Sequence, residues 1–211
     1  METEQLKELA RQLSCPEGEN GLKTAEQMNF SNGGMTRFTI RTLNPQPGET
    51  VLEIGPGNGE HVHELSDVQY QGADISELMV AEARRINHAR VAAGTAAFDL
   101  VPADGLPYAD QSFDKIFTVN TLYFWQQPEA YAAEIYRVLR PGGTFCLAFA
   151  LRSFMEKLPF VTYGFRLYDE QAALAVLGSF SLKEVVFQTE EIVGNTGQSV
   201  IRDYAVIVAH K

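Results

Sequence analysis

The stretch Val51-Leu52-Glu53-Ile54-Gly55-Pro56-Gly57-Asn58-Gly59 indicates how this chain folds. Residues 51–54 read as a buried strand, and three alternating glycines follow. Glycine adopts positive φ easily and lets a ligand approach the backbone without meeting a Cβ. The free N–H groups at the start of a following helix face an anion or a polar ligand edge. The stretch predicts a strand, a ligand-binding loop and a helix; the alternative is a tight turn that binds nothing.

Similar apolar runs recur along the chain and alternate with helical patterns. Further strands are predicted at residues 70–73, 97–101, 115–119 and 144–150, and helices at about 59–66, 76–93, 128–139 and 169–177. Apolar strands separated by helices indicate a parallel sheet covered on both faces. The last two runs, 182–187 and 204–209, have no helix between them and are predicted to pair in antiparallel. The predicted fold class is α/β: a doubly wound, mostly parallel seven-stranded sheet with an antiparallel C-terminal edge strand.

The first 45 residues differ in character from the rest of the chain. Leu6, Leu9, Ala10 and Leu13 have the spacing of one face of an amphipathic helix. A second helical stretch, from about 22 to 43, is expected to be interrupted at Ser31-Asn32-Gly33-Gly34. We therefore predict a helical segment at residues 1–45 and a single ligand-binding domain at residues 46–211.

Composition excludes several classes of protein. The chain has 211 residues, of which 45% are apolar and 21% charged, close to globular averages, so disorder and fibrous structure are excluded. Acidic residues outnumber basic ones 27 to 17, and the net charge of −10 disfavours nucleic acid as a partner. No apolar run approaches the roughly 18 residues of a membrane span. The oligomeric state is not readable from the sequence.

The cysteines and the N-terminal stretch indicate a cytoplasmic protein. Cys15 and Cys146 lie far apart without metal-ligand spacing, so reduced thiols are expected. The first residues show no basic region followed by an apolar core, the pattern of a secretory signal. We therefore expect a cytoplasmic location without a membrane anchor.

The spacing of the glycines restricts the class of ligand that the loop can bind. A dinucleotide fingerprint is G-x-G-x-x-G, but Glu60 stands three residues after Gly57, where that fingerprint has its last glycine. Glu60 would place a carboxylate near the pyrophosphate. A ligand with one ammonium group and one carboxylate fits better than a dinucleotide. An NAD-dependent oxidoreductase remains as the alternative.

Several stretches, in order, resemble the class I S-adenosylmethionine-dependent methyltransferases, of the small-molecule type related to ubiquinone/menaquinone C-methylases. They are VLEIGPGNG at 51–59, YQGADIS at 70–76, ADGLPY at 103–108 with SFD at 112–114, and LRPGG at 139–143. The resemblance spans about a hundred residues. It implies S-adenosylmethionine as cofactor and methyl transfer to a small-molecule acceptor that the sequence does not identify.

The resemblance also implies a set of cofactor contacts. Asp74, at the tip of the second strand, would accept from the ribose hydroxyls, and Asp104 would accept from the adenine amino group. Ile75 and Met79 either pack on the adenine or belong to the core, and Asn120 would lie against the methionine portion. The implied cofactor-binding set is Glu53, Gly55, Gly57, Asn58, Gly59, Asp74, Ile75, Met79, Asp104, Gly105, Leu106 and Asn120.

Methyl transfer from a sulfonium is an in-line displacement in which alignment and exclusion of water matter most. It requires no metal, and His61, His63, His88 and His210 have no metal-ligand spacing, so no metal site is expected. Tyr123, Trp125 and Tyr163 are candidates for the acceptor pocket, with core packing as the alternative. No general base is identifiable, and a non-catalytic protein that only binds the cofactor is also compatible with the sequence.

The segment at residues 28–35 is a candidate lid. In related folds the chain before the first glycine motif often lies over the cofactor. Asn29 and Asn32 lie one helical turn apart, so both amides can face one ligand edge. Gly33 and Gly34 are expected to act as a hinge. The alternative is an ordinary corner between two helices.

Overall fold

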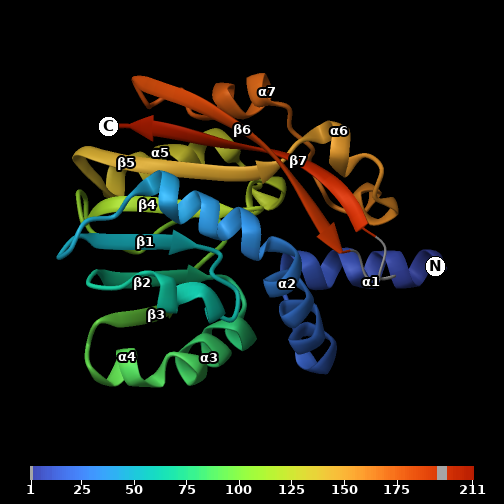
Figure 1. The fold of residues 1–211 in the computed structure, drawn as a ribbon, viewed down its shortest axis with the longest axis horizontal. Coiled ribbons are helices and arrows are strands. Elements are labelled where there is room, and N and C mark those ends of the chain that lie inside the picture. The colour runs from blue at the N-terminus through green and yellow to red at the C-terminus, as the bar shows by residue number, and fades with distance from the viewer. Residues whose placement is uncertain (1, 194–198) are drawn as a thin grey trace.

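The computed structural model describes residues 2–193 and 199–211, and they form a seven-stranded sheet flanked by helices (Figure 1). The strand order is β3-β2-β1-β4-β5-β7-β6. The strands are β1 (Thr50–Ile54), β2 (Gln69–Asp74), β3 (Ala96–Leu100), β4 (Phe113–Val119), β5 (Leu139–Ala150), β6 (Leu182–Val193) and β7 (Ser199–His210).

The strand directions confirm the predicted fold class. β1 to β5 pair in parallel, with Val51 opposite both Tyr70 of β2 and Lys115 of β4. β7 runs antiparallel to its two neighbours, β5 and β6. The antiparallel strand is thus second from the edge, and β6 forms the edge itself.

Helices cover the sheet, and two of them differ from expectation. The α-helices are α1 (Thr3–Ser14), α2 (Gly18–Leu43), α3 (Glu77–Ile86), α4 (His88–Ala92), α5 (Pro128–Val138), α6 (Arg152–Met155) and α7 (Glu170–Val176). The 3₁₀ helices are η1 (Glu60–Glu64), η2 (Leu122–Phe124) and η3 (Pro159–Thr162). The helix predicted at 59–66 is only the short η1. The helix predicted at 76–93 ends at Asn87, whose side-chain amide donates to the carbonyls of Gly59 and Ala83, and restarts as α4.

The predicted interruption of the second helix is wrong, because α2 is continuous through Gly33 and Gly34. Each glycine costs a helix about 1 kcal/mol relative to alanine, which tertiary contacts outweigh here. A Cβ on Gly34 would lie 2.2 Å from Oε2 of Glu190 in β6. The glycine is therefore needed for close packing, and Figure 1 shows α2 changing direction near its middle.

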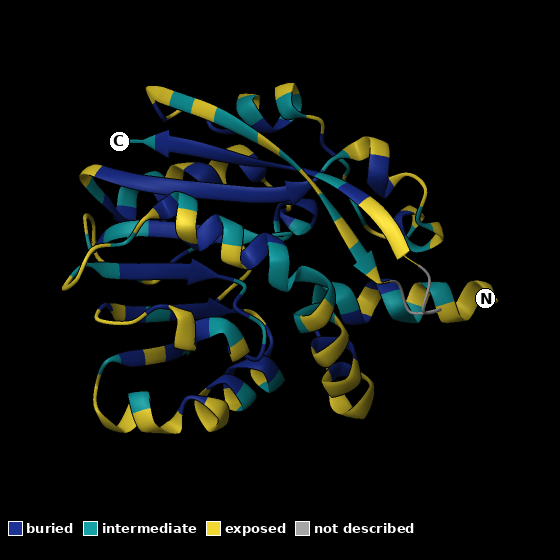
Figure 2. Ribbon diagram, viewed as in Figure 1, coloured by how far each residue is buried: buried dark blue, intermediate teal, exposed yellow. Residues whose placement is uncertain are grey.

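The core lies along the central strands, which are buried on both faces (Figure 2). Phe117 of β4 and Phe145 and Phe149 of β5 are fully buried. α2 packs across β4 and β5 and thereby reaches the carboxyl ends of the parallel strands. None of the helices in the described residues has the length and apolarity needed to cross a membrane.

Candidate functional site

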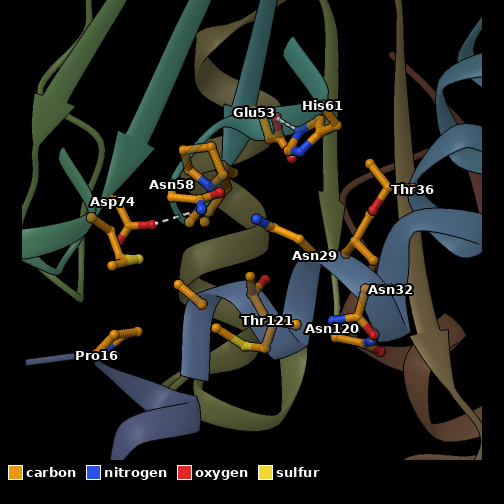
Figure 3. A pocket seen from close by; sticks show the side chains of 18 of the residues that line it. Pro16, Asn29, Asn32, Thr36, Glu53, Asn58, His61, Asp74, Asn120 and Thr121 are labelled. Atoms are coloured by element: carbon orange, nitrogen blue, oxygen red, sulfur yellow. Dashed lines mark hydrogen bonds and ion pairs between the residues drawn. The ribbon is translucent and has the colours of Figure 1, made fainter. Parts of the chain in front are cut away.

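A cavity of about 630 Å³, here called the cofactor cavity, opens at the carboxyl ends of β1, β2 and β4 (Figure 3). Its wall is formed by the loops after β1, β3 and β4, the end of α1 and the inner side of α2. The strand order reverses between β1 and β4, and open α/β sheets bind ligands at such a switch point. The cavity thus occupies the place where this fold binds small molecules.

The three glycines after β1 have different tasks. All take positive φ: +71° at Gly55, +57° at Gly57 and +66° at Gly59. A Cβ on Gly55 would lie 2.5 Å from the Thr121 side chain, so this glycine permits close packing. A Cβ on Gly57 would meet no atom within 4 Å, and Gly57 lines the cavity. Gly57 therefore leaves open a space that any side chain would fill.

Asp74 ends β2 and turns its carboxylate toward the glycine loop (Figure 3). One carboxylate oxygen accepts from the backbone N–H of Gly57 at 3.1 Å, and the other accepts from the N–H of Ser76 at 2.8 Å. Burial raises the pKa of Asp74 to about 6, although these backbone hydrogen bonds act in the opposite direction. The acid lies at the cavity wall with acceptor capacity left for a ligand.

Glu53 and His61 form an ion pair at the cavity wall (Figure 3). The Glu53 oxygens lie 2.7 and 2.9 Å from Nε2 of His61, and the Tyr70 hydroxyl donates to the same carboxylate at 2.5 Å. Burial lowers the pKa of His61, but the charge and hydrogen bond of Glu53 outweigh it, and the pKa is raised. The spacing of the two residues in the sequence did not indicate this pair, because Glu53 lies on β1 and His61 lies on η1, which folds back over that strand.

α2 presents a polar face to the cavity. Asn29, Asn32 and Thr36 line it at helical spacing, so they project from one side of the helix (Figure 3). The Asn29 amide donates to the Glu60 carboxylate of η1. Asn32 lies beside Asn120, whose Nδ2 donates to Asn32 Oδ1 at 3.1 Å. Asn120 follows β4 with a left-handed φ of +59°, a conformation that asparagine adopts more readily than most residues.

Comparisons with known proteins agree with this geometry. The methyltransferase domain family matches residues 52–147. The O-methyltransferase resE of Aspergillus sclerotiorum is 29% identical over 126 residues, covering 58% of this chain and 48% of that protein. Phosphoethanolamine N-methyltransferase 3 of Arabidopsis thaliana is 30% identical over 166 residues, covering 74% and 34%. The chain spans about half the length of the first of these relatives.

Solved structures share the fold. A methyltransferase of Thermotoga maritima, described as a possible histamine N-methyltransferase, matches with a TM-score of 0.69 at 21% identity, covering 90% of this chain and 96% of that one. Phosphoethanolamine N-methyltransferase 2 of Haemonchus contortus, in complex with S-adenosylhomocysteine, matches with a TM-score of 0.70 at 15% identity, covering 96% and 60%. Residues 52–147 are thus similar to the methyltransferase domain family, and the described fold is the one that S-adenosylmethionine-dependent methyltransferases share.

The similarity to the ubiquinone/menaquinone C-methylases within this family is not confirmed. The relatives act on different atoms: resE is an O-methyltransferase, the Arabidopsis protein is an N-methyltransferase, and a rice relative is a cycloartenol C-24-methyltransferase. The atom that accepts the methyl group therefore does not follow from the family.

The cavity fits S-adenosylmethionine, the cofactor of this family, chemically. Its ribose hydroxyls match the buried carboxylate of Asp74, and the space beside Gly57 admits a ligand against the backbone. Five carboxylates line the cavity against one arginine, Arg37, counted over the described residues. That balance favours a sulfonium and an ammonium group over the two phosphates of a dinucleotide.

Most of the predicted site residues lie at the cavity. Those that line it are Glu53, Gly55, Gly57, Asn58, Asp74, Ile75, Met79, Asn120 and Trp125. Those that do not are Gly59, Asp104, Gly105, Leu106, Tyr123 and Tyr163. After β3 the wall is formed by Val101 and Ala103 instead of Asp104, which is exposed. The role of each residue in binding the cofactor stays a prediction.

The aromatic candidates separate into different environments. The buried Tyr123 hydroxyl lies 3.0 Å from both Asn120 Oδ1 and the Ala150 carbonyl oxygen, behind the cavity wall. Trp125 lines the cavity and packs against Tyr131, with ring centroids 4.9 Å apart. Tyr163 lies outside, after η3. Thr36 and Tyr131 also line the cavity, but in the sequence they occupy ordinary core-facing helix positions that give no signal of a site.

No group of three or more His, Cys, Asp or Glu side chains that could hold a metal ion occurs within residues 2–193 and 199–211. Of the two histidines that line the cavity, His61 is paired with the Glu53 carboxylate, and Nδ1 of His63 lies 2.6 Å from the Glu60 carbonyl oxygen.

Proposed function

We propose that this protein transfers a methyl group from S-adenosylmethionine to a small-molecule acceptor by in-line displacement. The observation that carries the proposal is the bonded pair of Asp74 and Gly57 at a cavity on the switch point of the sheet. Bound S-adenosylmethionine supplies an electrophilic methyl group on a sulfonium. The family and the acid-lined cavity support this choice over an NAD-dependent oxidoreductase.

The chain's own residues contribute binding, alignment and exclusion of water. Asp74 accepts hydrogen bonds from the ribose, and Gly57 lets the ligand lie against the backbone. The apolar part of the cavity wall is formed by Phe124, Trp125 and Met28, and α2 covers the cavity as a cap. Holding two reactants in line in a dry site is the main contribution that this reaction requires.

The acceptor is proposed to be a small molecule, because several relatives are named after small acceptors: phosphoethanolamine, cycloartenol and 27-O-demethylrifamycin SV. The net charge of −10 supports the prediction that nucleic acid is not a substrate. A cytoplasmic location, and the separation of a cap at residues 1–45 from a domain at 46–211, are also proposals.

The test has a binding arm and a turnover arm. Calorimetry with S-adenosylhomocysteine, S-adenosylmethionine and NAD should show micromolar-range binding of the two adenosyl compounds and no comparable binding of NAD. A panel of small phenols, amines and carbon acids, incubated with S-adenosylmethionine, should release S-adenosylhomocysteine with at least one member. Tighter binding of NAD would refute the cofactor assignment. Binding without turnover across the panel would favour a non-catalytic protein.

A further inference from the structure

Arg202 and Glu190 form a nearly buried ion pair on the two C-terminal strands. They are direct partners in the β6–β7 register, and their side chains are 4% and 18% exposed. Nε and Nη2 of Arg202 donate to Oε1 of Glu190 at 3.0 and 2.5 Å. Burying a charge is costly unless it is paired and hydrogen-bonded, so a guanidinium buried here requires specific partners.

The other hydrogen-bond partners of Arg202 lie on α2, about 170 residues earlier in the chain. Nη1 of Arg202 donates to Oδ1 of Asn32 at 2.8 Å, and Nη2 donates to the Ser31 carbonyl at 2.7 Å. Gly34 lets Glu190 approach the helix, since any Cβ there would collide with the carboxylate. The ion pair therefore anchors the middle of α2, where the helix lines the cofactor cavity.

The hydrogen bonds fix which way two amides face. Oδ1 of Asn120 accepts from the Ala150 backbone N–H at 3.1 Å, so its Nδ2 is the atom turned to Asn32. Asn32 Oδ1 then accepts from Asn120 and from Arg202, and a guanidinium has only donors. These two donors fix the orientation of the Asn32 amide, and both hydrogens of its Nδ2 are therefore available for another acceptor. Within the described residues no side chain or carbonyl accepts from that nitrogen.

We propose that Arg202, paired with Glu190, is a positioning residue that holds Asn32 with its NH₂ group toward the cavity, where it donates to the carboxylate of the bound cofactor's methionine portion. The inference rests on the proposed binding of S-adenosylmethionine. Asp74, which takes the ribose, and Asn32 lie on different sides of the cavity (Figure 3). An oxygen anion is the natural acceptor for an unpaired amide donor.

The test compares two ligands that differ in the group concerned. S-adenosylhomocysteine carries the amino-acid portion, whereas 5′-methylthioadenosine keeps adenine, ribose and sulfur without it. Asn32→Leu removes the donor at similar volume, and Arg202→Met combined with Glu190→Gln removes the anchor without leaving a lone charge. Each variant should weaken S-adenosylhomocysteine about tenfold and leave 5′-methylthioadenosine within about twofold.

A matched control and a conservative variant complete the design. Glu191→Gln makes the same charge change as Glu190→Gln at the adjacent exposed position and should bind both ligands like wild type. Arg202→Lys should restore little, because an ammonium cannot donate to the carboxylate, the amide and the carbonyl from a rigid fork. Thermal unfolding verifies that each variant is folded. Asn32→Leu decides the question if the strand variants fail to fold, since it changes only the cavity end of the network.

The possible outcomes distinguish a failure of this inference from a failure of the proposed function. Equal weakening of both ligands means that the network only maintains structure, and unchanged affinities mean that Asn32 does not meet the carboxylate; either result overturns this inference. A wild-type protein that binds neither ligand overturns the proposed function itself.

Discussion

The carboxylate of Asp74 accepts a 3.1 Å hydrogen bond from the backbone N–H of Gly57, so the acid that ends β2 and the glycine loop that follows β1 are held together by the protein itself. Burial raises the pKa of this carboxyl to about 6. The group therefore titrates within reach of physiological pH, and a ligand that needs the ionised acid competes with a proton.

The first prediction is a pH dependence of cofactor binding. Ribose hydroxyls donate to the ionised carboxylate, so affinity for S-adenosylhomocysteine should be constant above pH 6 and fall below it. The dissociation constant, measured by calorimetry, should rise about tenfold per pH unit in the acid range. Asp74→Asn should bind more weakly and lose the slope. A wild-type affinity that is flat across pH 6 would contradict the ionised role of Asp74.

Removing this carboxylate gives the second prediction. Asp74→Ala should weaken binding of S-adenosylhomocysteine by ~2 kcal/mol or more, because two charge-assisted hydrogen bonds to the ribose are lost. The fold should survive: the folded pKa lies above the ordinary value of 3.8, so ionised Asp74 costs stability at neutral pH. Urea unfolding checks the fold, and calorimetry checks the affinity. An unchanged dissociation constant in the folded variant would remove Asp74 from the site.

Local patterns were enough to predict the parts of the site that lie close in sequence. The strand before Gly55 and the glycine spacing follow from strand-and-loop chemistry, and the parallel order follows from apolar strands alternating with helices. The choice of Asp74 at the end of the next strand came from the resemblance to the methyltransferases. The position of Asp104 did not follow in the same way, because the path of the loop after β3 depends on packing against Arg137, which donates to the Leu106 carbonyl.

Contacts between residues that lie far apart in the chain could not be predicted from the sequence. Arg202 meets Asn32 across 170 positions, and no periodicity in either segment indicates the other. The glycines at 33 and 34 carried a local signal for a helix break, but the approach of Glu190 gives Gly34 a packing role inside a continuous helix. In both cases tertiary packing decides what the local sequence leaves open.

The third prediction concerns the Glu53–His61 pair. The folded pKa of His61 is raised above its ordinary 6.5, so the pair stabilises the fold fully below that pH and loses its contribution as pH rises through the folded pKa. The free energy of unfolding in urea should therefore fall as pH rises above His61's ordinary pKa of 6.5 and through its raised folded pKa in wild type. His61→Gln should be less stable at the acid end and show a flatter dependence. Parallel curves for the two proteins would mean that the pair contributes nothing.

A fourth prediction separates binding from backbone strain in the glycine loop. Gly57→Ala and Gly142→Ala both place a Cβ at positive φ, +57° and +77°, and neither Cβ meets an atom within 4 Å. Each should lose about 1–2 kcal/mol of stability from the left-handed backbone. Only Gly57 lines the cavity, so only Gly57→Ala should weaken S-adenosylhomocysteine, by about tenfold or more. Equal binding losses in the two variants would assign the effect to strain.

The last prediction concerns residues 28–35 as a lid over the cofactor. Asn29 and Asn32 line the cavity from α2, so their segment should become harder to open when a ligand fills the space beneath it. Hydrogen exchange at these amides should slow markedly on addition of S-adenosylhomocysteine, together with exchange at Gly55–Gly59. A response confined to the glycine loop would leave α2 as a static cap.

The two adjacent glycines of this segment supply the matched variants. A Cβ on Gly33 would meet the flexible end of Arg37 at 3.3 Å, so Gly33→Ala should stabilise α2 by up to ~1 kcal/mol and slow exchange. A Cβ on Gly34 would displace the Glu190 carboxylate and with it the anchor at Arg202, so Gly34→Ala should speed exchange at 28–35 and weaken binding. If both substitutions slowed exchange alike, helix propensity rather than the Glu190 contact would govern the motion of the cap.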